Sequence, residues 1–111
     1  MERGAGSGEV FDRVAEHASR PGFRISEIRI TPEQQVPWHH HSEIADTFYV
    51  LQGHVRISLR SPVEHVDLVV GESWGPVRAG RPHRVTNPGR EAAIFLVLQG
   101  MGTYDFAPDD P

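Results

Sequence analysis

The chain has 111 residues, enough for one small domain but not for two, and hydrophobic residues make up 38% of it. Its formal net charge of −4 provides no basic field, which argues against a nucleic-acid partner. The absence of cysteine excludes disulfides, thiolate metal ligands and a cysteine nucleophile. The 11 glycines and 9 prolines favour short strands joined by tight turns.

Nothing in the sequence predicts a membrane or secretory segment. Residues 1–8 are rich in glycine and lack the apolar core of a signal peptide. The longest apolar run, residues 92–98, is far too short to cross a bilayer. We therefore expect a cytoplasmic protein with no membrane partner.

The N-terminal part of the chain is weakly patterned. Residues 1–21 are expected to form an arm that is partly disordered. Within it, apolar residues of the segment 10–18 recur at a weak helical spacing, which fits a helix or an arm laid on a neighbouring subunit. Residues 23–31 then alternate as a strand, with a shift at Glu27 that predicts a β-bulge, and Pro32 ends the strand.

Short alternating segments follow one another through the rest of the chain. Residues 46–51 should place Asp46, Phe48 and Val50 inward. Further strands are expected at residues 54–60, 65–70, 74–77, 84–86 and 92–98. About eight short strands without a strong helix predict an all-β sandwich or barrel over residues 22–106, followed by a loose tail of residues 107–111.

The outward positions of these strands carry some apolar side chains. Tyr49 and Leu51 should face outward and, together with Trp38, form an apolar patch. A monomer has reason to cover such a patch. The sequence therefore predicts a homodimer.

Three consecutive histidines precede a carboxylate that can reach the same point. On a strand His39 and His41 share one face, and His40 takes the other. Two imidazoles about 7 Å apart along a strand can bind one ion through ring nitrogens at about 2.0–2.1 Å. Four intervening residues suffice for a turn that returns Asp46 beside them. Glu43 competes for the carboxylate position, but its place in the turn favours a solvated acid.

A fourth candidate ligand, His83, lies far along the chain. Gly80 and Pro82 before it supply a fixed turn, and Val85 and Thr86 after it favour an extended segment. The predicted ligands of a divalent transition metal are His39, His41, Asp46 and His83.

The order and spacing of these residues resembles the cupin superfamily. The first cupin motif is present as His39-x-His41, then Asp46, then Gly53, and the second as Gly71, Gly80, His83 and Asn87. Asp46 stands where the family usually has Glu, and Arg78 where it usually has Pro. The resemblance spans roughly residues 22–100. It implies a small single-domain cupin with a double-stranded β-helix, or jelly-roll, barrel.

Three residues are candidates for substrate binding. Phe48 is expected to pack in the core and line the cavity around the metal. Arg78 and Arg81 lie on the loop before His83 and could hold an anionic substrate by bidentate hydrogen bonds, with a solvated rim as the alternative.

Three or four protein ligands leave open positions on the ion, and nitrogen ligands with one carboxylate suit Fe, Mn, Ni, Zn or Cu. The resemblance implies a metal-dependent enzyme of the dioxygenase, isomerase, lyase or cyclase type, acting on a small organic substrate. Asp46, if it does not ligate directly, could be catalytic by moving a proton. The alternative is a non-catalytic module that binds a small ligand or the metal itself. A metal-free isomerase-like barrel is a third reading, against which the three aligned histidines speak.

Overall fold

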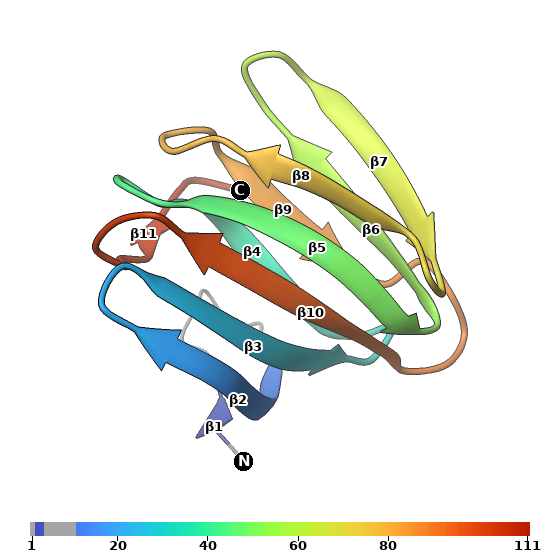
Figure 1. Ribbon diagram of the computed structural model, residues 1–111. Coiled ribbons are helices and arrows are strands. Elements are labelled where there is room, and N and C mark those ends of the chain that lie inside the picture. Colours follow the sequence, from blue (N-terminus) through green and yellow to red (C-terminus); the bar gives the residue numbers. More distant parts are fainter. Residues whose placement is uncertain (1, 4–10) are drawn as a thin grey trace.

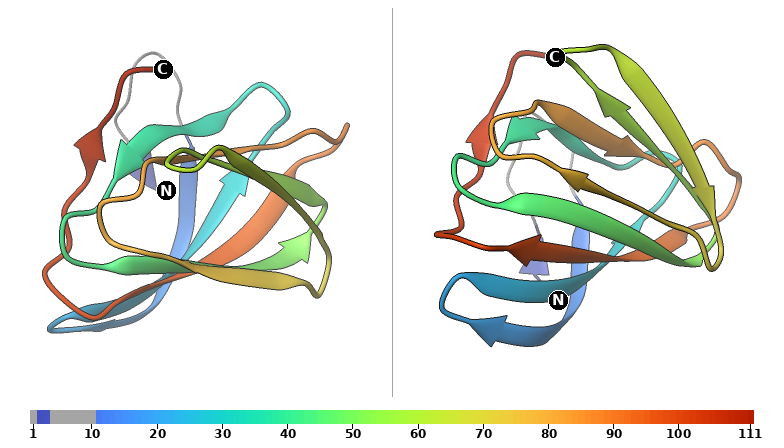
Figure 2. Two further views of the ribbon diagram at one scale, coloured as in Figure 1. Left: turned by 90° about the horizontal axis from the view of Figure 1, so that it is seen from above. Right: turned by 45° about the horizontal axis from the view of Figure 1, so that its top comes forward.

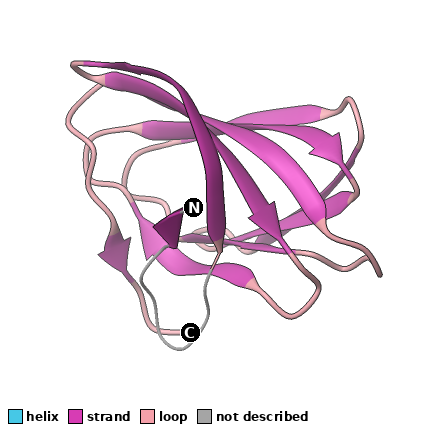
Figure 3. Cartoon of the chain, turned by 90° about the horizontal axis from the view of Figure 1, so that it is seen from below, coloured by secondary structure: helices cyan, strands magenta, loops and turns pink. Residues whose placement is uncertain are grey.

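The computed structural model describes residues 2–3 and 11–111, which form strands, turns and loops without a helix (Figure 3). The predicted all-β class is therefore confirmed. No helix in this part of the chain is long and apolar enough to span a membrane. The strands are β1 (Glu2–Arg3), β2 (Asp12–Arg20), β3 (Phe23–Ile30), β4 (Gln35–His40), β5 (Ala45–Gln52), β6 (His54–Leu59), β7 (Glu64–Val69), β8 (Ser73–Val77), β9 (His83–Thr86), β10 (Ala93–Gly100) and β11 (Ala107–Pro108).

The strands form two antiparallel sheets that face each other (Figures 1 and 2). One sheet has six strands in the order β1-β2-β3-β10-β5-β8, and the other has five in the order β11-β4-β9-β6-β7. From β3 to β6 each successive strand changes sheet, and the chain changes sheet again after β7, β8, β9 and β10. This crossing pattern gives a jelly-roll sandwich, as the sequence predicts.

The core lies between the two sheets. Val50 and Phe95 come from the six-stranded sheet and Ile57 and Val85 from the five-stranded one, and each is at most 1% exposed. Burying one such side chain contributes about 1.5–3 kcal/mol. The alternation predicted for residues 46–51 is confirmed, because the inward-facing side chains are buried and Tyr49 and Leu51 are exposed.

β10 lies in the middle of the six-stranded sheet, between β3 and β5. Its buried positions alternate as Ala93, Phe95, Val97 and Gln99. The prediction that the apolar run at residues 92–98 forms a buried strand is confirmed. Gln99 continues the inward row as a polar side chain, 6% exposed, at the end of the strand where the candidate site lies.

The helix considered for residues 10–18 is wrong over the described part of that segment. Residues 12–20 form β2, which pairs with β3 of the same chain. The register of this pair shifts between Arg13 and Ala15 and again between Glu16 and Ala18. These two irregularities displace the apolar positions from a strict period of two, which explains the apparent helical spacing. Residues 1 and 4–10, with most of the expected disorder, lie outside the described residues.

The bulge predicted at Glu27 is also wrong. β3 pairs with β10 without a register shift, and Ser26, Ile28 and Ile30 are all buried on one face. The irregularities lie opposite, on β2. Ser26 is a polar residue at an inward position, and this makes the alternation look interrupted in the sequence.

The expectation that residues 107–111 trail off is wrong as well. β11 pairs with β4, and the Asp109 backbone N–H donates to Trp38 O at 2.9 Å. The Asp109 carboxylate accepts from His40 Nδ1 at 3.0 Å, which also confirms that His40 points away from the other histidines. The C-terminal segment therefore covers what would be an open edge of the five-stranded sheet.

The single apolar patch predicted from Trp38, Tyr49 and Leu51 is not formed. Tyr49 and Leu51 are 39% and 41% exposed on β5 of the six-stranded sheet. Trp38 lies on β4 of the other sheet, with the Arg60 guanidinium 3.9 Å from its ring centre. The assignment of strands to opposite sheets, which local alternation does not reveal, separates the three side chains.

Candidate metal centre

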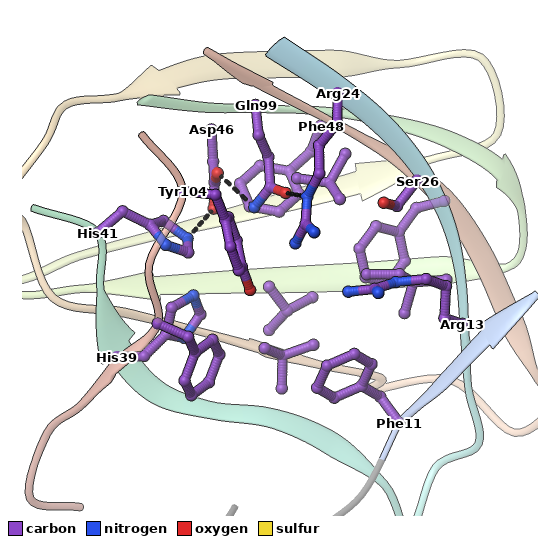
Figure 4. Close-up of a pocket in the computed structure, with 16 residues that line it drawn as sticks. Phe11, Arg13, Arg24, Ser26, His39, His41, Asp46, Phe48, Gln99 and Tyr104 are labelled. Carbon is purple, nitrogen blue, oxygen red and sulfur yellow. Dashed lines mark hydrogen bonds and ion pairs between the residues drawn. The ribbon is translucent and has the colours of Figure 1, made fainter. Parts of the chain in front are cut away.

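Four buried side chains converge between the sheets at one end of the sandwich. They are the four residues that the sequence predicts as ligands: His39, His41, Asp46 and His83. Each offers one ligand atom, and these four atoms lie within 4.8 Å of one another. Figure 4 shows three of them, with Asp46 joined to His41 and with His39 beside His41. Such a group could hold a metal ion.

The strand pairing explains why residues so far apart in sequence meet. His39 on β4 is directly opposite His83 on β9, and their ring centres are 4.2 Å apart. His41 follows immediately after β4, on the same face as His39. Asp46 reaches the histidines from β5 in the opposite sheet. Glu43, the competing acid, is exposed in the intervening turn.

Each of the three imidazoles is oriented by a backbone carbonyl. Nδ1 of His39 lies 2.7 Å from Pro37 O, Nδ1 of His41 lies 2.6 Å from Asp105 O, and Nδ1 of His83 lies 2.9 Å from Arg81 O. A carbonyl oxygen can only accept, so Nδ1 carries the proton in all three rings. The Nε2 atoms are thereby left as lone-pair donors for a metal.

The carboxylate of Asp46 completes this arrangement. Its Oδ2 lies 2.9 Å from Nε2 of His41 and 2.9 Å from Nε2 of His83. With the ring protons on Nδ1, two neutral imidazoles would each turn a lone pair toward a carboxylate oxygen, which is repulsive. A cation between them, whether a proton or a metal ion, removes this repulsion. Three nitrogen donors with one carboxylate oxygen fit a divalent transition metal.

A comparison of the sequence with protein-family models agrees with this fold and with this set of candidate ligands. Residues 26–99 match the family model for the cupin domain. The chain is a cupin. No curated protein matches it. The cupin superfamily that the motifs resemble is thus confirmed over two thirds of the chain.

Solved structures similar to this cupin share its fold at low sequence identity. An uncharacterized conserved protein with a double-stranded β-helix domain from Klebsiella pneumoniae is 23% identical, with a TM-score of 0.75, 96% of this chain and 90% of that chain covered. TT1209 from Thermus thermophilus is 22% identical, with a TM-score of 0.72 and coverages of 84% and 85%. Oxalate decarboxylase from Bacillus subtilis is 20% identical, with a TM-score of 0.70, and the match covers 78% of this chain but 23% of that one.

The cupin holds its carboxylate through a row of side chains that the sequence did not reveal. Arg24 on β3, Gln99 on β10 and Asp46 on β5 are directly opposite one another on adjacent strands. Gln99 Nε2 donates to Asp46 Oδ1 at 3.0 Å, and Arg24 Nε donates to Gln99 Oε1 at 2.7 Å (Figure 4). Gln99 therefore fixes the carboxylate so that Oδ2 faces the histidines. In the sequence, the polar Gln99 at an inward position of β10 was the signal that could have revealed this row.

The pKa values of the ligands differ because their surroundings differ. Burial, helped by the neighbouring His83, lowers the pKa of His39 to about 3, which keeps this ring neutral. Burial opposes ionisation of Asp46, but hydrogen bonds from His41 and His83 outweigh it and hold the pKa of the carboxyl well below its usual range. Burial likewise disfavours charge on His41, yet its hydrogen bond to Asp46 raises the pKa of this ring. The surroundings of Asp46 thus favour its ionised form, whereas those of His39 favour the neutral ring.

A cavity of about 30 Å³ lies beside the ligands. Its walls include Phe48, as predicted, with Phe95 and Val97, and its polar side chains include Arg13 and Arg24. From the C-terminal segment, Tyr104 and Phe106 also line it, and Phe106 stacks on His39 with ring centres 4.3 Å apart. The cavity is mostly apolar with a few polar groups at the metal end.

The two arginines predicted to bind substrate lie elsewhere. Arg78 is exposed on the loop after β8. Arg81 donates to the carbonyls of Arg60 and Pro62 at 3.0 and 2.8 Å and pairs with Glu64, so it holds the turn between β6 and β7. Neither lines the cavity, so a substrate would have to extend outside it to meet them.

Proposed function

We propose that this cupin binds a divalent transition metal through His39, His41, Asp46 and His83 and is a metal-dependent enzyme for a small organic substrate. One observation carries the proposal: three imidazoles and one carboxylate converge in a buried place, with four potential ligand atoms within 4.8 Å of one another. The ion is one of Fe, Mn, Ni, Zn or Cu, among which the ligand types do not select.

The residues of the chain have separate tasks in this proposal. The histidines bind through Nε2 and remain oriented by their carbonyl partners. Asp46 supplies one oxygen, while its other oxygen stays bonded to Gln99. The metal, when bound, supplies Lewis-acid character or a place for O₂. Phe48 and its apolar neighbours restrict water around the substrate, and Asp46 can move a proton through Oδ2 where it does not ligate.

The proposed reaction is an oxygenation, an isomerisation, a lyase reaction or a cyclisation of a small substrate. The similarity to oxalate decarboxylase supports a small acid as one candidate substrate, at 20% sequence identity and over 23% of that enzyme. The size of the cavity points the same way, since about 30 Å³ accommodates few heavy atoms.

Elemental analysis of protein purified from cells grown with each metal tests the proposal. We expect about one equivalent of metal per chain in the wild type and little or none in His83→Ala, because removing a ligand lowers metal affinity by at least about 100-fold. His54→Ala, a half-exposed histidine near Asp67, is the matched control and should keep its metal. Full occupancy in His83→Ala would contradict the ligand assignment.

A non-catalytic binding module is the second candidate, because the same fold serves binding and catalysis. The two candidates separate when metal-loaded protein is offered small acids, diketones and thiols, with product formation and O₂ uptake measured. Turnover that disappears in His83→Ala supports the enzyme. Stoichiometric metal and ligand binding without turnover of any compound supports the module.

We also propose a homodimer, supported by the exposure of Tyr49 and Leu51 on β5. Light scattering of the wild type and of Tyr49→Ser with Leu51→Ser tests this, with a dimer expected for the first and a monomer for the second. A wild-type monomer at all concentrations would contradict it. A cytoplasmic location stays a prediction.

A further inference from the structure

Among the described residues, no carboxylate pairs with Arg24, a positive charge beside the candidate metal centre. Arg24 on β3 is half-buried and lines the cavity. Within the described part of the chain, no acidic side chain pairs with it, and its hydrogen bond to Gln99 uses Nε alone. Asp46, the buried acid of the site, faces the histidines. Its link to Arg24 is indirect, through the hydrogen bonds of Gln99. The two Nη groups of Arg24 therefore remain available to a ligand.

The guanidinium is held in a defined place. Gln99 fixes Nε at 2.7 Å, and the Tyr104 ring centre lies 3.5 Å from Cζ, a stacked cation–π contact. Figure 4 shows the guanidinium of Arg24 turned into the cavity beside Tyr104. An arginine fixed in this way loses little freedom when it binds a planar anion with two parallel hydrogen bonds.

Arg24 also lies where a ligand would enter. A second hollow on the surface, lined by residues of the turn between β2 and β3 and by Ile44, shares three lining residues with the metal cavity: Arg24, Gln99 and Tyr104. These three side chains thus separate the outer hollow from the metal. Adjacent strands are about 4.8 Å apart, so the backbones of Arg24 and Asp46 are about 10 Å apart, with Gln99 of β10 between them. The cavity that Arg24 lines together with the candidate metal ligands is about 30 Å³, so it admits only a short ligand.

We propose that Arg24 is the residue that binds the substrate's carboxylate, and that the site selects a small carboxylic acid with a second oxygen for the metal, such as a 2-hydroxy or 2-oxo acid. This inference rests on the proposed metal function and names its substrate class. The carboxylate meets the Nη groups of Arg24, and the adjacent hydroxyl or carbonyl oxygen is directed to the ion.

The alternative role for Arg24 is purely structural: it would orient Gln99 and nothing else. That role needs only Nε, and a neutral donor could perform it. It does not account for an unbalanced charge kept half-buried at the junction of the two hollows, which costs desolvation without a partner. A bound carboxylate supplies the missing partner.

Calorimetric titration of the Co(II)-loaded protein with glycolate tests the inference, and glycolamide, its neutral amide, is the matched ligand. We expect glycolate to bind and glycolamide to bind at least about 10-fold more weakly. In Arg24→Gln, glycolate affinity should fall about 10- to 100-fold, as expected for two hydrogen bonds to a charged group. Binding of glycolamide and of Co(II) should change less than about 3-fold. Arg90→Gln, an exposed arginine in the turn before β10, is the matched control and should bind glycolate normally.

Several outcomes would overturn the inference. Glycolate binding by folded Arg24→Gln at wild-type affinity does so, as does equal loss of glycolate and glycolamide binding, which is the result expected of a structural role. Arg24→Lys keeps the charge and guards against a folding failure; it should bind glycolate with an affinity between those of wild type and Arg24→Gln. If the wild type takes up neither Co(II) nor any of the five proposed metals, the proposed function fails, and the same titration of metal-free wild type and Arg24→Gln still shows whether Arg24 binds the carboxylate.

Discussion

The two sheets contribute to the candidate metal centre in different ways. The five-stranded sheet supplies the histidines, and two of them, His39 and His83, are oriented by carbonyls only two residues earlier in the chain. The six-stranded sheet supplies Asp46, which is oriented by Gln99 at a separation of 53 residues. The histidine side is therefore built largely from local geometry, whereas the carboxylate side depends on the register of three strands.

Removing the metal takes away the ion that both sides are proposed to bind. This change should therefore have the largest effect on stability. A ligand present at 1,000 times its dissociation constant stabilises a protein by about 4 kcal/mol, which for a domain of this size corresponds to roughly 15–30 °C in Tm. We expect a decrease of this order when EDTA is added to metal-loaded wild type in a thermal melt. His83→Ala should show almost no response to EDTA. An unchanged Tm after complete removal of the metal would contradict a stabilising site.

Acidification of the metal-free protein isolates the histidine side. The pKa of His39 is lowered to about 3, whereas an unfolded histidine takes up its proton near 6.5. The unfolded state thus binds more protons between these values, so the stability from neutral His39 is present above pH 6.5 and is lost as the pH falls toward 3. The raised pKa of His41 gives stability that is fully present below pH 6.5 and is lost only as the pH rises above that value, so it does not oppose this effect at acidic pH.

Urea unfolding of wild type and His39→Gln at pH 7 and pH 5 measures this effect. The free energy of unfolding of the wild type relative to the variant should fall by up to about 1.4 kcal/mol per pH unit below 6.5. The same difference at both pH values would show that His39 is protonated normally in the folded state.

Gln99→Leu isolates the carboxylate side. The substitution leaves Asp46 Oδ1 buried without its donor, and partners of this kind contribute about 10- to 100-fold to metal affinity. We expect that loss in a competition titration against a metal-sensitive dye. Gln52→Leu, on an exposed position of β5, is the control and should leave metal affinity unchanged. Wild-type affinity in Gln99→Leu would mean that the row across the three strands does not orient Asp46.

The smallest effect is expected where the C-terminal segment meets the histidines. Ser42 Oγ donates to Asp105 Oδ2 at 2.6 Å, and Asp105 O accepts from His41 Nδ1. The Ser42 backbone N–H also donates to Asp105 Oδ1, and β11 is held on β4 independently. Ser42→Ala should therefore change metal affinity less than about 3-fold and stability by about 1 kcal/mol or less. A loss as large as that of Gln99→Leu would show that the non-local support of His41 is as important as that of Asp46.

The sequence predicted the elements whose signal is local. The alternation along residues 46–51 placed Phe48 and Val50 in the core, and the spacing of His39 and His41 placed both rings on one face. Prediction failed at β2, where two register shifts break the period, and at the C-terminal segment, whose partner β4 is about 70 residues away. Pairing of this kind depends on contacts that alternation within one strand does not encode.

The sequence by itself determined the strand faces, the cupin motifs and the identity of the four converging side chains, because side-chain alternation and motif spacing are properties of short segments. Only the tertiary structure decided that Gln99 stands between Asp46 and Arg24, that Arg24 rather than Arg78 or Arg81 faces the cavity, and that the last residues close over His41. Those relations depend on register and sheet order between strands distant in the chain, where a shift of one residue would turn each side chain to the opposite face.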